Sequence, residues 1–125
     1  MKTRYLLSYI VILLSGCASF QVGTDVEAGR KAYLVGNNAV ALDYFQKAAD
    51  LDPNYVYGTA LRQNIWSYVG RSEYSVSKLP QAQNSLEKAL SLNKEEDMAR
   101  LYLGLTLARS GESSAGTKAN PRRNE

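Results

Sequence analysis

Small and hydrophobic residues in the stretch 36–53 recur at the spacing that two packed helices require. Gly36 is placed to end one helix, because a glycine tolerates the left-handed exit conformation. Ala41 and Ala48 would let two helix backbones approach closely, and Phe45 between them would fill the seam. Pro53 suits the first turn of a following helix. The stretch therefore predicts a hairpin of antiparallel helices.

Similar signals along the rest of the chain predict an all-α fold with five helices after the N-terminal segment. A capping box of Thr24 and Glu27 starts the first helix, and Pro80 opens the fourth. Asn93 with Glu96 is expected to cap the fifth. The expected ranges are 24–35, 37–51 and 54–75, then a fourth helix from position 80 and a fifth that ends near position 111.

A second set of core residues, Ala82, Leu86 and Ala89, has the same spacing as the first set. The pattern resembles the tetratricopeptide repeat, whose standard period is about 34 residues. The resemblance implies a right-handed solenoid of antiparallel helix hairpins with about two and a half repeats, which is a scaffold for binding other proteins. The interval between the two sets exceeds the standard period by nearly two helical turns, so we expect the excess to lengthen the start of the third helix. An insertion in the 71–78 loop is the alternative.

The first sixteen residues have the features of a secretory signal. Lys2 and Arg4 precede an apolar run that is too short for a mature membrane anchor. The Leu-Ser-Gly-Cys ending resembles the bacterial lipobox, which implies cleavage before Cys17 and lipidation of its thiol. Ala18, in place of an aspartate, implies the periplasmic face of the outer membrane. An ordinary signal peptide or a short uncleaved anchor is the alternative.

These features divide the chain into a signal peptide at 1–16, a tether at 17–23, a helical domain at 24–111 and a tail at 112–125. The tail holds no apolar side chain larger than alanine. It cannot bury enough apolar surface to fold, so we expect it to be disordered.

Composition argues against catalysis and against nucleic-acid binding. Removal of residues 1–16 leaves thirteen basic residues against twelve acidic ones, so the mature chain is close to neutral and has no basic stripe. The chain has no histidine, which removes the commonest general base. It has no glycine-rich phosphate loop, and its single cysteine is expected to carry lipid, so we expect no cofactor. The acidic run Glu95-Glu96-Asp97 is explained by the dipole of a helix N-terminus, so we expect no metal site.

The repeat resemblance also implies a concave groove lined by the first helix of each repeat. Arginine and tyrosine recur at the implied positions, and both are effective anchors for a bound peptide. Arg30 and Arg71 share one repeat position and are expected on one surface. Alternatively, the tyrosines fill the seams between helices. The groove residues implied are Arg30, Tyr33, Asn64, Tyr68, Arg71, Tyr74, Tyr102 and Arg109.

The last predicted helix has two apolar faces. One face, with Met98, Leu101, Tyr102 and Leu105, is expected to pack against the preceding unit. The opposite face, with Leu103 and Leu107, would bind a partner or a second copy of the chain, or stay partly exposed.

The leading interpretation is a membrane-anchored, non-catalytic adaptor lipoprotein that binds a protein in the bacterial cell envelope. The alternative is a truncated relative of a longer repeat lipoprotein, which keeps the fold but has lost its C-terminal part and its function.

Overall fold

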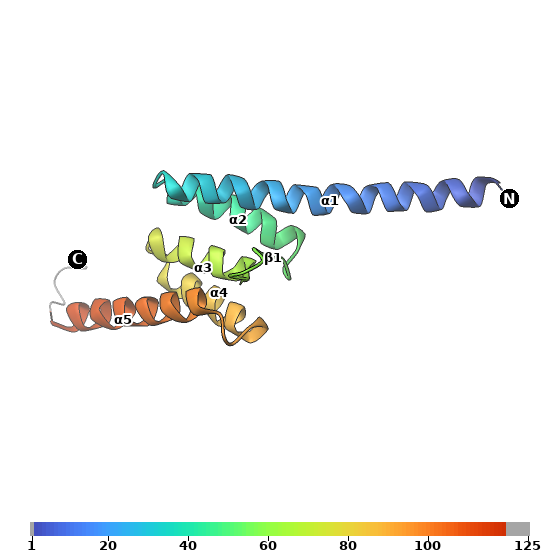
Figure 1. Cartoon of the computed structure of the whole chain (residues 1–125). Coiled ribbons are helices and arrows are strands. Elements are labelled where there is room, and N and C mark those ends of the chain that lie inside the picture. Colours follow the sequence, from blue (N-terminus) through green and yellow to red (C-terminus); the bar gives the residue numbers. More distant parts are fainter. Residues whose placement is uncertain (1, 120–125) are drawn as a thin grey trace. The chain divides into compact units, whose positions relative to one another are not determined.

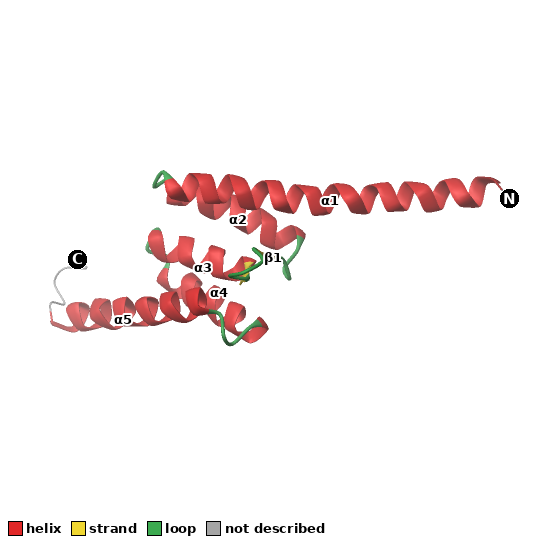
Figure 2. Cartoon of the chain, viewed as in Figure 1, coloured by secondary structure: helices red, strands yellow, loops and turns green. Residues whose placement is uncertain are grey.

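The computed structural model describes the backbone of residues 2–119 and the side chains of residues 17–112. Within that part of the chain, five helices and two short strands account for the regular structure (Figures 1 and 2). They are α1 (Lys2–Leu34), α2 (Asn38–Leu51), β1 (Val56–Tyr57), β2 (Gln63–Asn64), α3 (Ile65–Ser75), α4 (Leu79–Leu92) and α5 (Asp97–Ala119). The prediction of an all-α fold is confirmed.

The chain divides into two compact units, Met1–Tyr55 and Val56–Glu125. This differs from the single helical domain that was expected over residues 24–111. The first unit contains α1 and α2, and the second contains β1, β2, α3, α4 and α5.

The first unit is a helix hairpin whose seam is built as the sequence predicts. Ala41, Phe45 and Ala48 of α2 are fully buried. Phe45 lies against Gly29 of α1, where an added Cβ would come within 2.6 Å of the Phe45 Cε1 atom. Gly36 joins the helices with φ +80°, the left-handed conformation that favours glycine. Absence of a side chain at position 29 is therefore what lets the phenylalanine enter the seam.

The second unit contains the same hairpin, formed by α3 and α4. Leu86 occupies the place of Phe45 and lies against Gly70, where an added Cβ would come within 2.5 Å of the Leu86 Cγ atom. Ser77 replaces Gly36 at the turn and has a φ of 65°. Helices α2 and α4 have 14 residues each. The predicted correspondence between the two hairpins is therefore confirmed.

The sequence predicted that the additional residues between the two hairpins lengthen the third helix, and this prediction is wrong. The alternative, an insertion in the 71–78 loop, is also wrong. They form the connection between α2 and α3, in which Val56 pairs with Asn64 in a short antiparallel ladder. Helix formation stops at Asp52, whose carboxylate accepts a hydrogen bond from the Asn54 amide at 3.0 Å. Gly58 then turns the chain with φ +88°. These local turns satisfy the backbone without a helix, and α3 begins only at Ile65.

The first helix also differs from its prediction, because α1 runs without a break through the expected tether at 17–23. Thr24 does not cap a helix here. Its hydroxyl donates a hydrogen bond to the Phe20 carbonyl at 3.0 Å, one turn earlier in the same helix. Glu27 pairs with Arg30 instead of closing a capping box. Gly23 alone does not stop the helix, since one interior glycine costs only about 1 kcal/mol.

The expected disordered tail is helical in its first part, because α5 continues to Ala119. Residues 120–125 lie outside the described residues. Low apolar content therefore did not stop the helix at Gly111, where the repeat pattern ends.

Helix α5 packs through a different face from the one predicted. Ala99 and Thr106 are fully buried, and Tyr102 and Leu103 pack against the core of Ala82, Leu86 and Ala89. Leu101 and Leu105, which were expected in the core, are 59% and 40% exposed. Leu103, which was expected outside, is half-buried. The small residues at positions 99 and 106 allow a closer helix approach than two leucines would, which explains this rotation of α5.

Candidate partner-binding surface

Asn64, one of the predicted groove residues, lies inside the second unit and is only 3% exposed. Its side chain accepts a hydrogen bond from the Trp66 amide at 3.1 Å and so caps α3. The Asn64 Nδ2 group donates to the Ala89 carbonyl at 3.1 Å and to the Glu96 carboxylate. Because these bonds satisfy its polar atoms within the unit, Asn64 holds α3 to the start of α5 and is not a groove residue.

Glu96 accepts the hydrogen bonds that join Asn64 and Ser67. From the sequence, Glu96 was expected only to interact with the dipole of a helix N-terminus. It is 4% exposed and accepts hydrogen bonds from the Asn64 amide at 3.2 Å and from the Ser67 hydroxyl. Burial raises the pKa of the Glu96 carboxyl above its usual value, and the bonds from Ser67 and Asn64 offset part of that rise. No signal in the sequence separates this buried acid from its exposed neighbours Glu95 and Asp97.

A second buried acid, Glu73, joins α3 to α4 and was not identified from the sequence. Glu73 is 6% exposed and accepts a hydrogen bond from the Ser85 hydroxyl. Burial raises the pKa of the Glu73 carboxyl, while the Ser85 bond and the nearby charge of Lys78 act in the opposite direction. Through these hydrogen bonds, Glu73 holds α3 to α4 and Glu96 holds α3 to the start of α5.

Two of the predicted groove residues, Tyr68 and Arg71, lie together on α3. Tyr68 is 4% exposed and its ring meets the Tyr57 ring edge-on, with centroids 6.1 Å apart. The Arg71 guanidinium lies over the Tyr68 ring at 5.2 Å from its centroid. Tyr57 comes from β1 and was missed because its segment was assigned to a helix. Tyr68 therefore fills a seam, and the half-buried Arg71 is the member of this group that can meet a partner.

Tyr74, Tyr102 and Arg109 form the second cluster of predicted groove residues in this unit. The rings of Tyr74 and Tyr102 are 5.6 Å apart at 73°, which joins α3 to α5. Arg109 donates to the Tyr74 carbonyl at 3.1 Å and to the Ser77 hydroxyl at 2.8 Å. Arg109 therefore ties α5 to the turn between α3 and α4. Ser77 was missed, although it stands at the repeat position of Gly36.

In the first unit, the predicted groove residues Arg30 and Tyr33 lie near the end of α1. Arg30 pairs with Glu27 at 3.0 Å, and its side chain is 36% exposed. Tyr33 is half-buried. Arg30 and Arg71 belong to different units, so their expected place on one surface stays a prediction.

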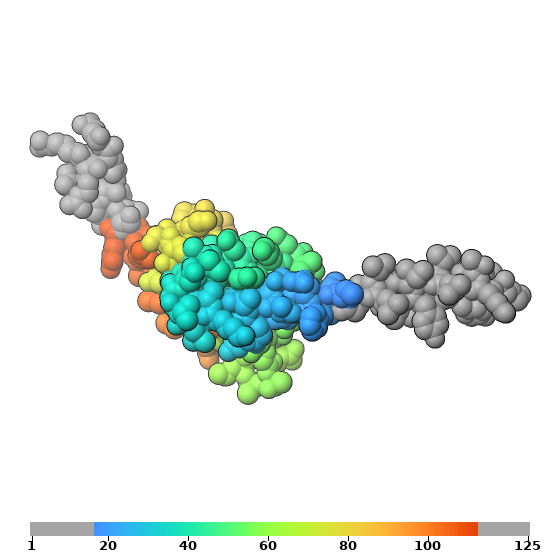
Figure 3. Space-filling view, turned by 90° about the horizontal axis from the view of Figure 1, so that it is seen from above, coloured from blue at the N-terminus to red at the C-terminus, as the bar shows by residue number. Residues whose placement is uncertain are grey.

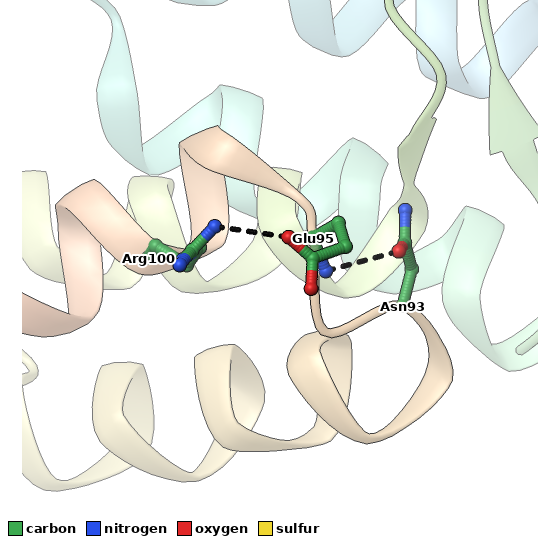
Figure 4. A network of polar contacts seen from close by, with 3 residues as sticks. All are labelled: Asn93, Glu95 and Arg100. Atoms are coloured by element: carbon green, nitrogen blue, oxygen red, sulfur yellow. Dashed lines mark hydrogen bonds and ion pairs between the residues drawn. The ribbon is translucent and has the colours of Figure 1, made fainter.

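The acidic run at the start of α5 is shared among three separate roles. Glu95 pairs with Arg100 at 3.3 Å, and its amide donates to the Asn93 side chain at 3.1 Å (Figure 4). Glu96 is buried, as described above, while Asp97 is exposed in the first turn of the helix. Across the described residues, no group of three potential ligands is placed to hold a metal ion.

Cys17 is exposed on α1. The described side chains of α1 form the blue to cyan part of the surface in Figure 3. The first buried side chain after Cys17 is Val22, five positions further along the helix. The thiol therefore lies outside the buried seam between α1 and α2. Among the described residues, none of the helices combines the length and apolar character of a membrane span.

No protein-family model matches this chain, and no curated protein matches it in sequence. The described residues form two helix hairpins with the same contact between a glycine and a large apolar residue. They also include an exposed thiol at Cys17, and most of the polar side chains described above hold the helices together. Such an arrangement can present surfaces for binding.

Proposed function

We propose that the chain is a non-catalytic adaptor of the tetratricopeptide type, which binds a protein partner in the bacterial cell envelope. The observation that carries this proposal is the internal repetition of the helix hairpin. Gly29 with Phe45 and Gly70 with Leu86 make the same contact in the two hairpins. Repeated helical hairpins build extended surfaces for protein binding, and their stability comes from contacts between neighbouring elements.

The proposal includes a lipid anchor at Cys17, on the periplasmic face of the outer membrane. It is supported by the lipobox-like sequence at 14–17 and by the exposure of the thiol. Acyl chains contribute about 0.8 kcal/mol per buried methylene, and two or more of them hold a protein stably on a bilayer. The surface of the helical units is then left free to bind a partner.

The anchor is tested by expressing the Cys17→Ala variant and fractionating the cell envelope. We expect an unprocessed precursor or a form released from the membrane, because the acceptor thiol is gone. Ser19→Ala is the matched control, since Ser19 is exposed two positions away and carries no proposed role. Normal maturation and membrane retention of the Cys17→Ala chain would exclude lipidation at this site.

The adaptor role is tested by affinity purification from detergent-solubilised envelopes, followed by mass spectrometry. A stoichiometric protein partner is expected with the wild-type chain. Arg30→Glu combined with Arg71→Glu should abolish its recovery if both arginines belong to the binding surface, since losing one anchor arginine commonly costs about 2 kcal/mol. Lys31→Glu, at an exposed position of α1, is the control. Recovery of no partner from wild-type envelopes would favour the alternative of a truncated, non-functional relative.

A further inference from the structure

Helix α1 carries a row of exposed residues along the side that faces away from α2. Its members follow one another at alternating intervals of three and four residues, a spacing that places them on one face of a helix. The buried residues of α1, among them Val22, Val26 and Gly29, lie on the opposite face, toward the seam. We call the row the α1 stripe, and it consists of Cys17, Phe20, Thr24, Glu27, Lys31 and Leu34.

The large apolar side chains of the α1 stripe lie near its two ends. Phe20 is 78% exposed and Leu34 is 81% exposed, as is Val35 directly after the helix. A helix rises about 1.5 Å per residue, so about 21 Å of helix separate Phe20 from Leu34. Beside Phe20 the surface has a shallow depression of about 560 Å³, which Gly23 and Ala28 help to line. Single exposed apolar residues are ordinary on a protein surface, but these stand in one row with Cys17.

The polar residues of the α1 stripe suit the surface of a phospholipid bilayer. Lys31 is exposed one turn before Leu34. A lysine stem can lie along apolar surface while its ammonium group reaches the phosphates of the headgroups. The Glu27 carboxylate pairs with Arg30 at 3.0 Å, so its negative charge is offset by a neighbour on the same helix. In helices that lie on membranes, attraction to anionic lipids adds to the burial of apolar side chains.

The outward side of α2 has a different composition. The residues along the middle of that side are Asp43, Lys47 and Asp50, and all three are exposed. None of these three side chains is apolar, and two of them carry a negative charge that an anionic lipid surface repels. Of the two outward sides of the hairpin, the α1 stripe is therefore the one that suits a bilayer.

The position of Cys17 identifies the occupant of the α1 stripe. Cys17 is the first member of the stripe, and α1 continues from it to Leu34 without a break. The acyl chains that the proposed function places on this thiol enter the bilayer. Phe20 follows about 4.5 Å further along the helix axis, so a rigid helix, and not a tether, joins it to the anchor. The apolar face of a helix at a membrane surface lies about 5–10 Å inside the boundary between headgroups and acyl chains.

We propose that the first unit lies flat on the bilayer, with the α1 stripe against the lipid headgroups and the outward side of α2 in water. Phe20 and Leu34 enter the boundary between headgroups and acyl chains, and Lys31 meets the phosphates. This inference rests on the lipid anchor of the proposed function and goes beyond it. An anchor joined to the unit by a flexible tether would give the unit no fixed orientation.

The orientation is tested with the mature lipoprotein, residues 17–125, reconstituted in vesicles of phosphatidylethanolamine and phosphatidylglycerol. Cys17 is the only cysteine of the chain, so after lipidation an introduced cysteine is the only free thiol. Nitroxide labels are attached at Phe20→Cys, Lys31→Cys and Leu34→Cys, with Asp43→Cys on α2 as the control. All four positions are exposed, so the labels disturb no buried side chain. Electron paramagnetic resonance then compares the access of oxygen, which concentrates in lipid, with that of a water-soluble nickel chelate.

The labels at Phe20 and Leu34 should be more accessible to oxygen than to the nickel chelate, and the label at Asp43 should show the reverse. Phe20→Ser combined with Leu34→Ser should shift the label at Lys31 toward the nickel chelate, because both inserted side chains are lost. Leu51→Ser is the matched control, since it replaces an exposed leucine of α2, and it should leave the label at Lys31 unchanged.

Three results would overturn the proposal. The first is equal access of the nickel chelate to the labels on the α1 stripe and to the label at Asp43. The second is contact with lipid at Phe20 together with contact with water at Leu34, since α1 would then not lie flat. The third is magnetic coupling between Phe20 labels of two chains, since the occupant would then be a second copy.

The Cys17→Ala variant separates failure of this inference from failure of the anchor. If that variant leaves the membrane while the labels on the lipidated chain face water, this inference fails and the anchor stands. If Cys17→Ala matures normally and stays in the membrane, the anchor fails and this inference fails with it.

Discussion

Replacement of two equivalent glycines by alanine should have different effects on stability. Gly70 and Gly104 lie within α3 and α5, at the same position of successive repeats. In a helix interior, glycine is about 0.8–1.0 kcal/mol less favourable than alanine. Both substitutions gain this free energy of helix propensity. The difference in stability between the two variants therefore measures the cost of the contacts that the new methyl group makes.

At Gly70 the methyl group meets an occupied space. An added Cβ would lie 2.5 Å from the Leu86 Cγ, 2.7 Å from its Cδ2 and 3.3 Å from its backbone nitrogen. Leu86 is fully buried, so it cannot move away without disturbing the core. Overpacking of this kind typically costs about 1–3 kcal/mol. Combined with the gain in helix propensity, Gly70→Ala should therefore destabilise the second unit by about 0–2 kcal/mol, whereas Gly104→Ala should stabilise it by about 1 kcal/mol.

The measurement is thermal unfolding of the full chain by circular dichroism, with amide hydrogen exchange to assign the change to α3, α4 and α5. A difference of about 1 kcal/mol corresponds to about 4–8 °C in Tm for a domain of roughly 60–100 residues. Gly23→Ala on α1 is a further control, because nothing lies within 4 Å of its added Cβ. Equal gains in Tm for Gly70→Ala and Gly104→Ala would show that Leu86 does not occupy the Gly70 position.

Three further predictions concern the seam, the buried acids and the tie to α5. Phe45→Ala should lower the free energy of unfolding of the first unit by about 3–5 kcal/mol, measured by denaturant titration. An unchanged midpoint would show that Phe45 is not buried between α1 and α2. Burial raises the pKa of the Glu73 carboxyl above 4.5, so the stability of the second unit should fall as pH rises above that value, and Glu73→Gln should make this dependence weaker. A pH profile of Tm that Glu73→Gln leaves unchanged would contradict the buried position of Glu73. Arg109→Ala removes bonds to the Tyr74 carbonyl and Ser77, so amide exchange should quicken in α5, while equal exchange rates would refute the tie.

The seam of each hairpin could be predicted from the sequence, because it depends on size alone. A large residue between two alanines, with a glycine on the facing helix, has few other ways to pack. The spacing at Ala41, Phe45 and Ala48 returns at Ala82, Leu86 and Ala89, and all six residues are fully buried. Gly36 was also predictable, because its φ of +80° favours a residue without a side chain.

The connection at 52–64 could not be predicted from the same kind of pattern. Tyr57, Leu61, Ile65 and Tyr68 keep a helical spacing, which favoured one long helix. In the structure, Leu61 is 78% exposed while Ile65 is fully buried, so the spacing carried no information about a common face. Local hydrogen bonds at Asp52 and the positive φ of Gly58 decided the outcome. Such turn interactions compete with helix formation and leave the hydrophobic period unchanged.

Most of the residues predicted to line a groove pack inside the second unit instead, as their burial and contacts show. Asn64 and Tyr68 are 3% and 4% exposed. Tyr74 and Tyr102 meet edge-on between two helices. A tyrosine at a repeat position suits either a seam or a binding surface, and the sequence contains no feature that separates the two. Of the eight residues proposed, Arg30 and Arg71 are left as the side chains most able to bind a partner.

The rotation of α5 explains why its leucines lie outside. Hydrophobicity alone favours a core of Leu101 and Leu105, yet Ala99 and Thr106 are the residues that are fully buried. Small side chains let α5 approach α4 closely, and the Thr106 hydroxyl loses nothing on burial because it donates to the Tyr102 carbonyl at 2.6 Å. Leu103 and Tyr102 pack against the core of Ala82, Leu86 and Ala89. The contact with α4 thereby fixes the orientation of α5, in which Gly104 and Leu107 stay exposed.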